Sequence, residues 1–131
     1  MSKKKITTKT SKKTESKKEV IELDAKGQIL GRLSTEIAVY LQGKHSPAYK
    51  PNMDDDTVVK VVNAKKVKVT GKKKTDKIYW HYSGYPGGIY GKTYEEMFEK
   101  DPTWVIRKAV ERMLPDNRLR KGRMKRLIVE K

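Results

Sequence analysis

The segment from Gly87 to Thr93 is the part of the chain whose residue types come closest to enzyme chemistry. Its glycines, Lys92 and Thr93 are the groups of a phosphate-binding loop, in which backbone amides and a lysine hold phosphates and a threonine holds magnesium. The spacing differs, because the position of the motif's first glycine holds Pro86, which has no amide hydrogen. We therefore expect a flexible loop that joins a strand to a helix. A phosphate-handling enzyme is the alternative, and magnesium-dependent binding of a nucleoside triphosphate would support it.

The aspartates and histidines of the chain are not spaced as the ligands of a metal site would be. Residues 54–56 are three consecutive aspartates, and in an extended chain their carboxylates alternate between two sides and cannot converge on one ion. His45 and His81 lie far apart, and the chain has no cysteine that could complete a zinc site or form a disulfide. We therefore expect a protein without enzymatic activity, metal or cofactor.

Positive charge is the dominant feature of the composition. The chain has 131 residues with 32 Lys and Arg against 16 Asp and Glu, which gives a net charge of +16. The cations gather at residues 2–19, at residues 72–74 and at residues 118–126. Nucleic acid is the expected partner, because many cations can neutralise its regular array of phosphates together.

An anionic membrane is the competing partner for such a chain. Membrane binding through residues 118–126 would need bulky apolar side chains opposite the basic face, and this stretch offers only Leu119 and Met124. No apolar run approaches the roughly 20 residues of a transmembrane helix. We therefore expect no membrane contact and a cytoplasmic location.

The distribution of apolar residues divides the chain into a tail and one domain. Residues 1–19 are rich in lysine, serine and threonine, so they bury too little apolar surface to fold alone and are expected to be disordered when free. The aliphatic residues gather from Val20 onward, and the remaining length fits one domain over residues 20–131.

Residues 81–88, with the sequence HYSGYPGG, carry groups that suit RNA. The glycines let the backbone approach another surface closely. Tyr82 and Tyr85 offer rings for stacking on unpaired bases, and His81 and Ser83 can form hydrogen bonds to phosphate or a 2′-hydroxyl. A turn whose tyrosines cover the core is the alternative. The nearby lysines at residues 72–74 favour RNA contact.

Two expected helices also carry cations that suit phosphate. Arg32 follows Gly31 at a helix start, where exposed amides attract anions. The stretch from Asn117 to Arg126 places six Lys and Arg on one expected helix. Their mutual repulsion would destabilise that helix in water, and neighbouring phosphates would remove the cost. This stretch is the strongest local indication of RNA binding.

The elements that position these groups follow from the hydrophobic pattern. Residues 20–23, 57–62, 67–69, 77–82 and 127–129 are expected strands, and residues 57–62 are apolar or β-branched at nearly every position, which is typical of a strand covered on both faces. A helix is expected over residues 33–41 and another over 102–114, the second with Asp101 as N-cap. Thr93 and Glu96 match a capping box. The order of elements predicts an α/β sandwich with some parallel pairing.

Several segments, taken together, resemble the bacterial large-subunit ribosomal protein thirteen family. They are residues 24–34 (DAKGQILGRLS), 43–45 (GKH), 63–64 (NA) with 70–73 (TGKK), 81–88 (HYSGYPGG), and 113–117 (MLPDN) with 125–127 (KRL). The resemblance runs in order from about residue 20 to residue 129. The tail is longer than the usual start of the family, and many relatives continue beyond Lys131, so the resemblance implies nothing about either end.

The resemblance implies a three-layer α/β/α sandwich with a central, mostly parallel four-stranded sheet. It also implies a structural component of the large ribosomal subunit that binds large-subunit rRNA early in assembly. Neighbouring ribosomal proteins are then expected partners, the protein's own messenger is a further possibility, and no homo-oligomer is expected. A free-standing RNA-binding regulator is the alternative, which would fail to sediment with large subunits.

The candidate RNA-binding residues come from the matched segments and from the basic runs. The resemblance implies roles for Arg32, Lys44, Lys72, Ser83, Gly84, Tyr85, Gly87, Gly88, Asn117 and Lys125. Their sequence neighbours add His45, Lys73, Lys74, His81, Arg118, Arg120, Lys121, Arg123 and Arg126.

Overall fold

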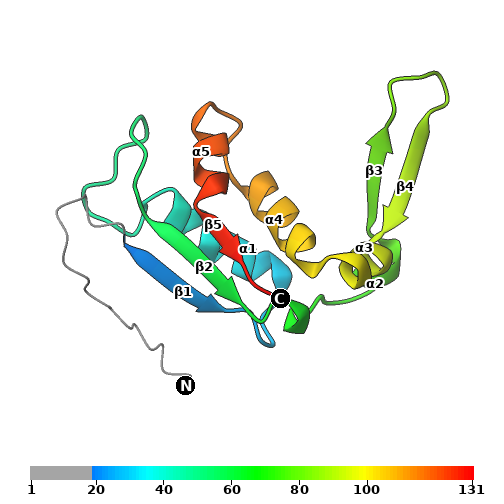
Figure 1. Cartoon of the computed structure of the whole chain (residues 1–131), viewed down its shortest axis with the longest axis horizontal. Coiled ribbons are helices and arrows are strands. Elements are labelled where there is room, and N and C mark those ends of the chain that lie inside the picture. Colours follow the sequence, from blue (N-terminus) through cyan, green and yellow to red (C-terminus); the bar gives the residue numbers. More distant parts are fainter. Residues whose placement is uncertain (1–18) are drawn as a thin grey trace.

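The computed structural model describes residues 19–131, so the expected tail at residues 1–19 lies outside the described residues except for Glu19. Strands and helices alternate through the first part of the described chain, and a hairpin and three helices precede the last strand (Figure 1). In chain order the elements are β1 (Val20–Asp24), α1 (Leu30–Leu41), β2 (Val58–Val62), the 3-10 helix η1 (Ala64–Lys66), α2 (Lys73–Asp76), β3 (Ile78–Tyr82), β4 (Ile89–Thr93), α3 (Tyr94–Lys100), α4 (Pro102–Met113), α5 (Leu119–Lys125) and β5 (Leu127–Val129).

The central sheet of the described residues has three strands in the order β1-β2-β5, all parallel. The mixed α/β class with parallel pairing is thus confirmed, whereas the expected fourth strand is reduced to a single bridge. At residues 67–69 only Lys68 pairs, with Ile29, through two backbone hydrogen bonds of 2.9 Å that involve Gln28 and Leu30. Pairing ends there because the chain turns at Gly71, whose φ is +66°.

Burial alternates along β2, so the prediction of a strand covered on both faces is wrong. Val59 and Val61 are fully buried, whereas Val58, Lys60 and Val62 are partly exposed. On the open face the Lys60 Nζ lies 2.9 Å from Glu130 Oε1. The three-layer arrangement that the resemblance implies is therefore not confirmed by residues 19–131. The β-branched run reflects strand propensity as well as burial, so it could not distinguish one covered face from two.

The core lies between the covered face of the sheet and the helices α1 and α4, which pack against each other; in Figure 1, α1 lies behind the sheet and α4 beside β5. Leu33, Ile37 and Leu41 of α1 recur at helical spacing and are fully buried, as predicted. Val105 and Ile106 of α4 are buried as well. Both helices therefore present one apolar face to the sheet.

Strands β3 and β4 form an antiparallel hairpin that projects from one end of the body (Figure 1). The expected flexible loop at residues 87–93 is thus wrong for residues 89–93, which pair with the aromatic strand from Tyr82↔Ile89 to Ile78↔Thr93. The base of the hairpin is fixed to the body by Tyr79, whose ring meets Trp104 of α4 edge-on at 5.1 Å between centroids.

The predicted helix starts at Thr93 and Asp101 are confirmed. The Glu96 amide donates to Thr93 Oγ1 at 3.4 Å, and the Thr93 amide donates to the Glu96 carboxylate at 3.3 Å, which completes the capping box. The Asp101 carboxylate accepts from the Thr103 amide at 3.2 Å, with Pro102 in the first helical turn. These caps fix where α3 and α4 begin.

Candidate nucleic-acid interface

The residues predicted to bind RNA fall into two groups in the structure. Most are exposed to solvent, and a few are partly or fully buried. Gly88, Arg120 and Arg126 are partly buried, and Arg123 is buried. The exposed residues are Arg32, Lys44, His45, Lys72, Lys73, Lys74, His81, Ser83, Gly84, Tyr85, Gly87, Asn117, Arg118, Lys121 and Lys125.

Arg123 and Arg126 converge on one carboxylate, Asp54, which lies about seventy positions earlier in the sequence. Arg123 Nε donates to Asp54 Oδ1 at 3.1 Å, and Arg126 donates to both Asp54 oxygens at 2.7 and 2.8 Å. A further hydrogen bond of 3.2 Å joins Arg126 to the Leu41 carbonyl at the end of α1. The Arg123 side chain is only 3% exposed. Arg123 is therefore a structural residue, which corrects its expected role in RNA contact.

The electrostatics of this cluster favour the charged forms of both partners. The hydrogen bond from Arg126 holds the pKa of the Asp54 carboxyl below its usual range, against the opposing effect of burial. The same hydrogen bond raises the pKa of Arg126. Asp54 is one of the three consecutive aspartates at residues 54–56 that were considered above as metal ligands. Among residues 19–131, no group of three or more His, Asp or Glu is arranged to hold a metal ion.

Arg120 is also engaged within the protein. Its guanidinium donates to the carbonyls of Leu114 and Pro115 at 3.2 Å each, and its Nη1 lies 3.0 Å from Asp116 Oδ1. The sequence predicts repulsion among the cations of this helix. The acceptors of Arg120, together with Asp54, offset much of it. The helix itself begins at Leu119, two residues later than expected, and Asn117 accepts from the Arg120 amide at 3.2 Å.

Three cations of the α5 region remain directed to solvent. Arg118, Lys121 and Lys125 are exposed and are spaced three and four residues apart, which places them on one side of the helix. The Asp54 cluster occupies the other side. Helix α5 thus has a structural side and a free cationic side, a division that the sequence pattern alone did not reveal.

A second cationic surface surrounds α2. Lys72, Lys73, Asp76 and Lys77 line an open hollow of about 390 Å³. Three lysines around one carboxylate leave this hollow positive. Burial, followed by repulsion from Arg112 and Lys73, lowers the pKa of Lys77. A phosphate placed here would relieve that repulsion.

The start of α1 and the loop after it add further exposed cations. Arg32 lies in the first turn of α1, which has no side-chain N-cap. Lys44 and His45 follow Gly43, whose φ of +75° ends the helix. The His45 ring packs edge-on against Tyr40 at 5.4 Å, and its Nε2 lies 3.5 Å from a Glu19 carboxylate oxygen.

The hairpin tip is a turn stabilised by its own backbone. The Ser83 amide donates to the Gly88 carbonyl and the Gly88 amide to the Tyr85 carbonyl, both at 2.9 Å. Gly84 and Gly87 have positive φ angles of 91° and 72°, which strongly favour glycine. Tyr85 is 76% exposed, so the alternative in which the loop tyrosines cover the core is wrong.

The phosphate-binding-loop alternative loses its structural basis in this hairpin. Lys92 lies within β4, opposite Tyr79, and not in a loop that wraps a phosphate. The backbone of β4 pairs with β3, so it does not form the amide cradle that such a loop needs.

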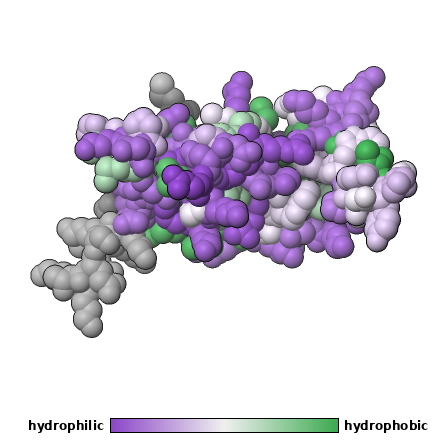
Figure 2. Space-filling view, turned by 90° about the horizontal axis from the view of Figure 1, so that it is seen from above, coloured by the Kyte–Doolittle hydropathy of each residue, from purple (hydrophilic) through white to green (hydrophobic). Residues whose placement is uncertain are grey.

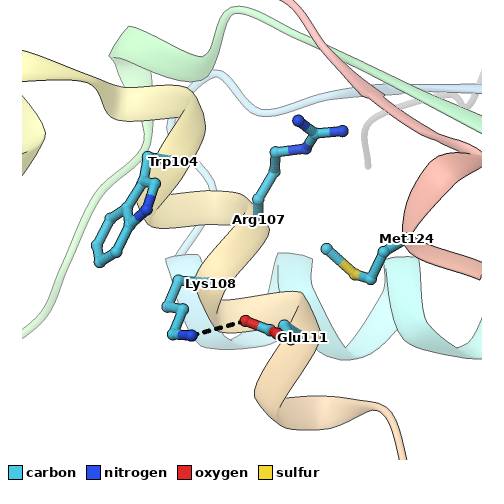
Figure 3. Close-up of a pocket in the computed structure, with 5 residues that line it drawn as sticks. All are labelled: Trp104, Arg107, Lys108, Glu111 and Met124. Carbon is cyan, nitrogen blue, oxygen red and sulfur yellow. Dashed lines mark hydrogen bonds and ion pairs between the residues drawn. The ribbon is translucent and has the colours of Figure 1, made fainter. Parts of the chain in front are cut away.

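A groove between α4 and α5 is a feature that the sequence did not indicate (Figure 3). It has a volume of about 260 Å³. Trp104 and Met124 contribute apolar surface, and Lys108 pairs with Glu111 at 2.8 Å along its wall. Arg107 donates to the Leu127 carbonyl at 3.2 Å, which joins α4 to β5. Lys108 is thus engaged in an ion pair and Arg107 in a structural contact, and the lining residues include no Ser, Thr, Cys or His.

Comparison with known proteins assigns the chain to a family. The family model described as Ribosomal protein L13 matches residues 18–129, a range that includes every described strand and helix. The chain belongs to the ribosomal protein L13 family. The resemblance predicted from the sequence motifs is thereby confirmed.

Curated relatives within the L13 family are similar over most of their length. A protein of Syntrophus aciditrophicus (strain SB) is 47% identical over 91% of this chain and 84% of the relative. One of Geobacter sulfurreducens is 46% identical over 94% of this chain and 86% of the relative. One of Pseudomonas aeruginosa (strain LESB58) is 50% identical over 83% of this chain and 77% of the relative. Each is named "Large ribosomal subunit protein uL13".

The part of this L13-family chain that the structure describes contains no helix long and apolar enough to cross a membrane.

Proposed function

We propose that this chain is a structural constituent of the large ribosomal subunit that binds large-subunit rRNA and supports an early step of subunit assembly. The observation that carries the proposal is the L13 family match over residues 18–129, together with relatives that are themselves named large-subunit proteins. Family membership also implies a structural rather than enzymatic role and a place in the cytoplasm within the ribosome. The proposal takes residues 20–131 as one RNA-binding domain that follows a basic tail.

The proposed contact surface consists of the exposed cations and the hairpin tip. Phosphates fit the free side of α5, the lysines around α2, and the cations at the two ends of α1, because these groups have few acceptors of their own. Unpaired bases and riboses fit the tip. The proposed residues are Arg32, Lys44, His45, Lys72, Lys73, Lys74, His81, Ser83, Gly84, Tyr85, Gly87, Gly88, Asn117, Arg118, Lys121 and Lys125.

Arg120, Arg123 and Arg126 act in this proposal by positioning other groups. Arg120 holds the chain between α4 and α5, and the two later arginines hold the loop around Asp54 against α5. Neighbouring ribosomal proteins are further expected partners. Binding to the protein's own messenger has no supporting observation in this chain and forms no part of the proposal.

The test is co-sedimentation. A tagged copy of the full chain, expressed in cells, is expected in purified large subunits at physiological salt in about one copy per subunit, because each copy would occupy one rRNA site. Large subunits that lack the tagged chain, with the protein found free or on other RNA, would contradict the proposal and favour a free-standing regulator.

A further inference from the structure

The hairpin stands out from the rest of the chain because it carries almost no charge. Residues 78–91 contain no Asp, Glu, Lys or Arg and form the longest uncharged stretch of a chain in which 37% of residues are charged. Figure 2 shows the contrast on one face of the molecule: the body is mostly hydrophilic, and hydrophobic and neutral surface gathers at the hairpin end.

One face of the hairpin combines large apolar side chains that the protein leaves in solvent. The register places Ile78, Trp80 and Tyr82 of β3 on the same face as Ile89 of β4. Their exposed fractions are 41%, 64%, 59% and 63%. We call these four residues the apolar hairpin face. A monomeric soluble surface rarely leaves such a cluster uncovered, so this face is a candidate contact surface.

Gly91 lets the central ring of this face lie flat. Trp80 pairs directly with Gly91 across the hairpin, and a Cβ at Gly91 would stand 3.0 Å from the Trp80 ring and closer still to Ile78. The indole therefore covers the partner strand where another residue would push it away. The result is a flat platform with Trp80 at its centre.

The opposite face of the hairpin contacts the body at its base, through Tyr79. Tyr79 is buried against Trp104, and His81 packs edge-on against Tyr90 with ring centroids 4.9 Å apart. Lys92, the one charged residue within the two strands, also lies on this opposite face. The apolar hairpin face therefore points away from the body without any cation of its own.

We propose that the apolar hairpin face docks on an apolar surface of another protein in the same ribosomal particle, an inference that rests on the proposed function. Aromatic platforms that bind single-stranded RNA are accompanied by cations that hold the backbone, and this face has none. The cores of protein interfaces, in contrast, are depleted of charge and enriched in tyrosine and tryptophan. In this proposal the apolar hairpin face contacts an uncharged surface of a protein, whereas the cations of the body and the hairpin tip contact RNA.

Site-specific photo-crosslinking tests which class of partner covers this face. Benzoylphenylalanine replaces Trp80 in one variant and Lys73 in a matched variant, and each is irradiated in purified large subunits. We expect a protein adduct from position 80 and an RNA adduct from position 73. An RNA adduct from position 80, or no adduct, overturns the inference and leaves the proposed function intact. Absence of both variants from the subunits contradicts the proposed function itself.

A substitution gives an independent measurement. Because a buried interface tryptophan often dominates binding, Trp80→Ala should reduce retention of the chain in salt-washed large subunits by about tenfold or more, with Trp80→Tyr intermediate. Affinity for isolated rRNA should stay within about twofold, since Trp80 makes no proposed RNA contact. Met53→Ala, at a residue that is 58% exposed in another loop, is the control. Equal reductions for isolated rRNA and for the subunit would show that Trp80 contacts RNA.

Discussion

At the residue scale, Asp54 determines which cations of the basic C-terminal region are available to a partner. It is one carboxylate shared by two arginines, one of which is buried. A buried guanidinium without a counter-charge is costly, whereas the same group with good hydrogen bonds is tolerated. Asp54 therefore converts Arg123 from a surface cation into part of the scaffold that joins α5 to the loop before β2.

Replacing Asp54 by asparagine should destabilise the fold. The expected loss is about 2 kcal/mol in the free energy of unfolding at pH 7, less than for a fully buried pair because Asp54 is itself 26% exposed. Urea unfolding followed by circular dichroism measures it. Asp116→Asn is the control, because Asp116 is 89% exposed and should change the free energy of unfolding by no more than about 0.5 kcal/mol. Equal stability of D54N and wild type would contradict the structural role.

The same pair predicts a dependence of stability on pH. The Arg126 hydrogen bond lowers the folded-state pKa of Asp54 below its unfolded value. Its contribution is therefore fully present above about pH 4 and is lost as the pH falls through the lowered folded-state pKa. The difference in the free energy of unfolding between wild type and D54N should shrink over that window. A difference that stays constant down to pH 2 would exclude the charged carboxylate as its cause.

At the element scale, the sequence predicted local features well and pairings between distant segments poorly. The helical spacing of Leu33, Ile37 and Leu41 and the cap at Thr93 depend only on neighbouring residues, so both could be predicted. The burial of Arg123 depends on Asp54, which lies far away in the sequence, and no local pattern encodes that contact. The second strand of the hairpin was missed because its glycines and lysine favour a loop until the aromatic partner strand is known.

Substitutions on the two sides of α5 should affect different properties: those on the exposed side the affinity for rRNA, and those on the side facing Asp54 the free energy of unfolding. Arg118, Lys121 and Lys125 replaced together by glutamine should weaken rRNA binding and lower the salt slope by about 0.7–0.9 for each phosphate that is no longer neutralised, with little change in unfolding. Arg123→Gln alone should instead lower the free energy of unfolding, because it removes the buried ionic hydrogen bond from Arg123 Nε to Asp54, which then keeps only Arg126 as its partner. Filter binding and urea unfolding of both variants measure the two effects. A triple variant with wild-type affinity would show that this side faces away from RNA.

At the scale of the whole molecule, the charge is not spread evenly: cations gather in runs, and residues 78–91 carry none. The sheet, α1 and α4 pack around an apolar core, and the cations proposed to meet phosphate lie at the two ends of α1, around α2 and on the outer side of α5. The hairpin, in which Lys92 is the one charged residue of the two strands, extends from one end of this body (Figure 1). In the two proposals above, one small fold presents a surface for phosphates and a separate surface for apolar contact.

This arrangement predicts how binding responds to salt. A chain with net charge +16 that neutralises several phosphates releases their counterions, so the logarithm of its affinity for isolated rRNA should fall linearly and steeply with the logarithm of salt concentration. Several contacts at about 0.7–0.9 each give a slope of magnitude about 4 or more. Affinity for assembled subunits should be higher than for isolated rRNA at each salt concentration with a similar slope, because apolar contact at the hairpin adds a free-energy contribution that salt does not screen. A nearly flat plot for isolated rRNA would mean that the exposed cations do not meet phosphates, and coinciding plots for rRNA and subunits would remove the need for a second, apolar contact.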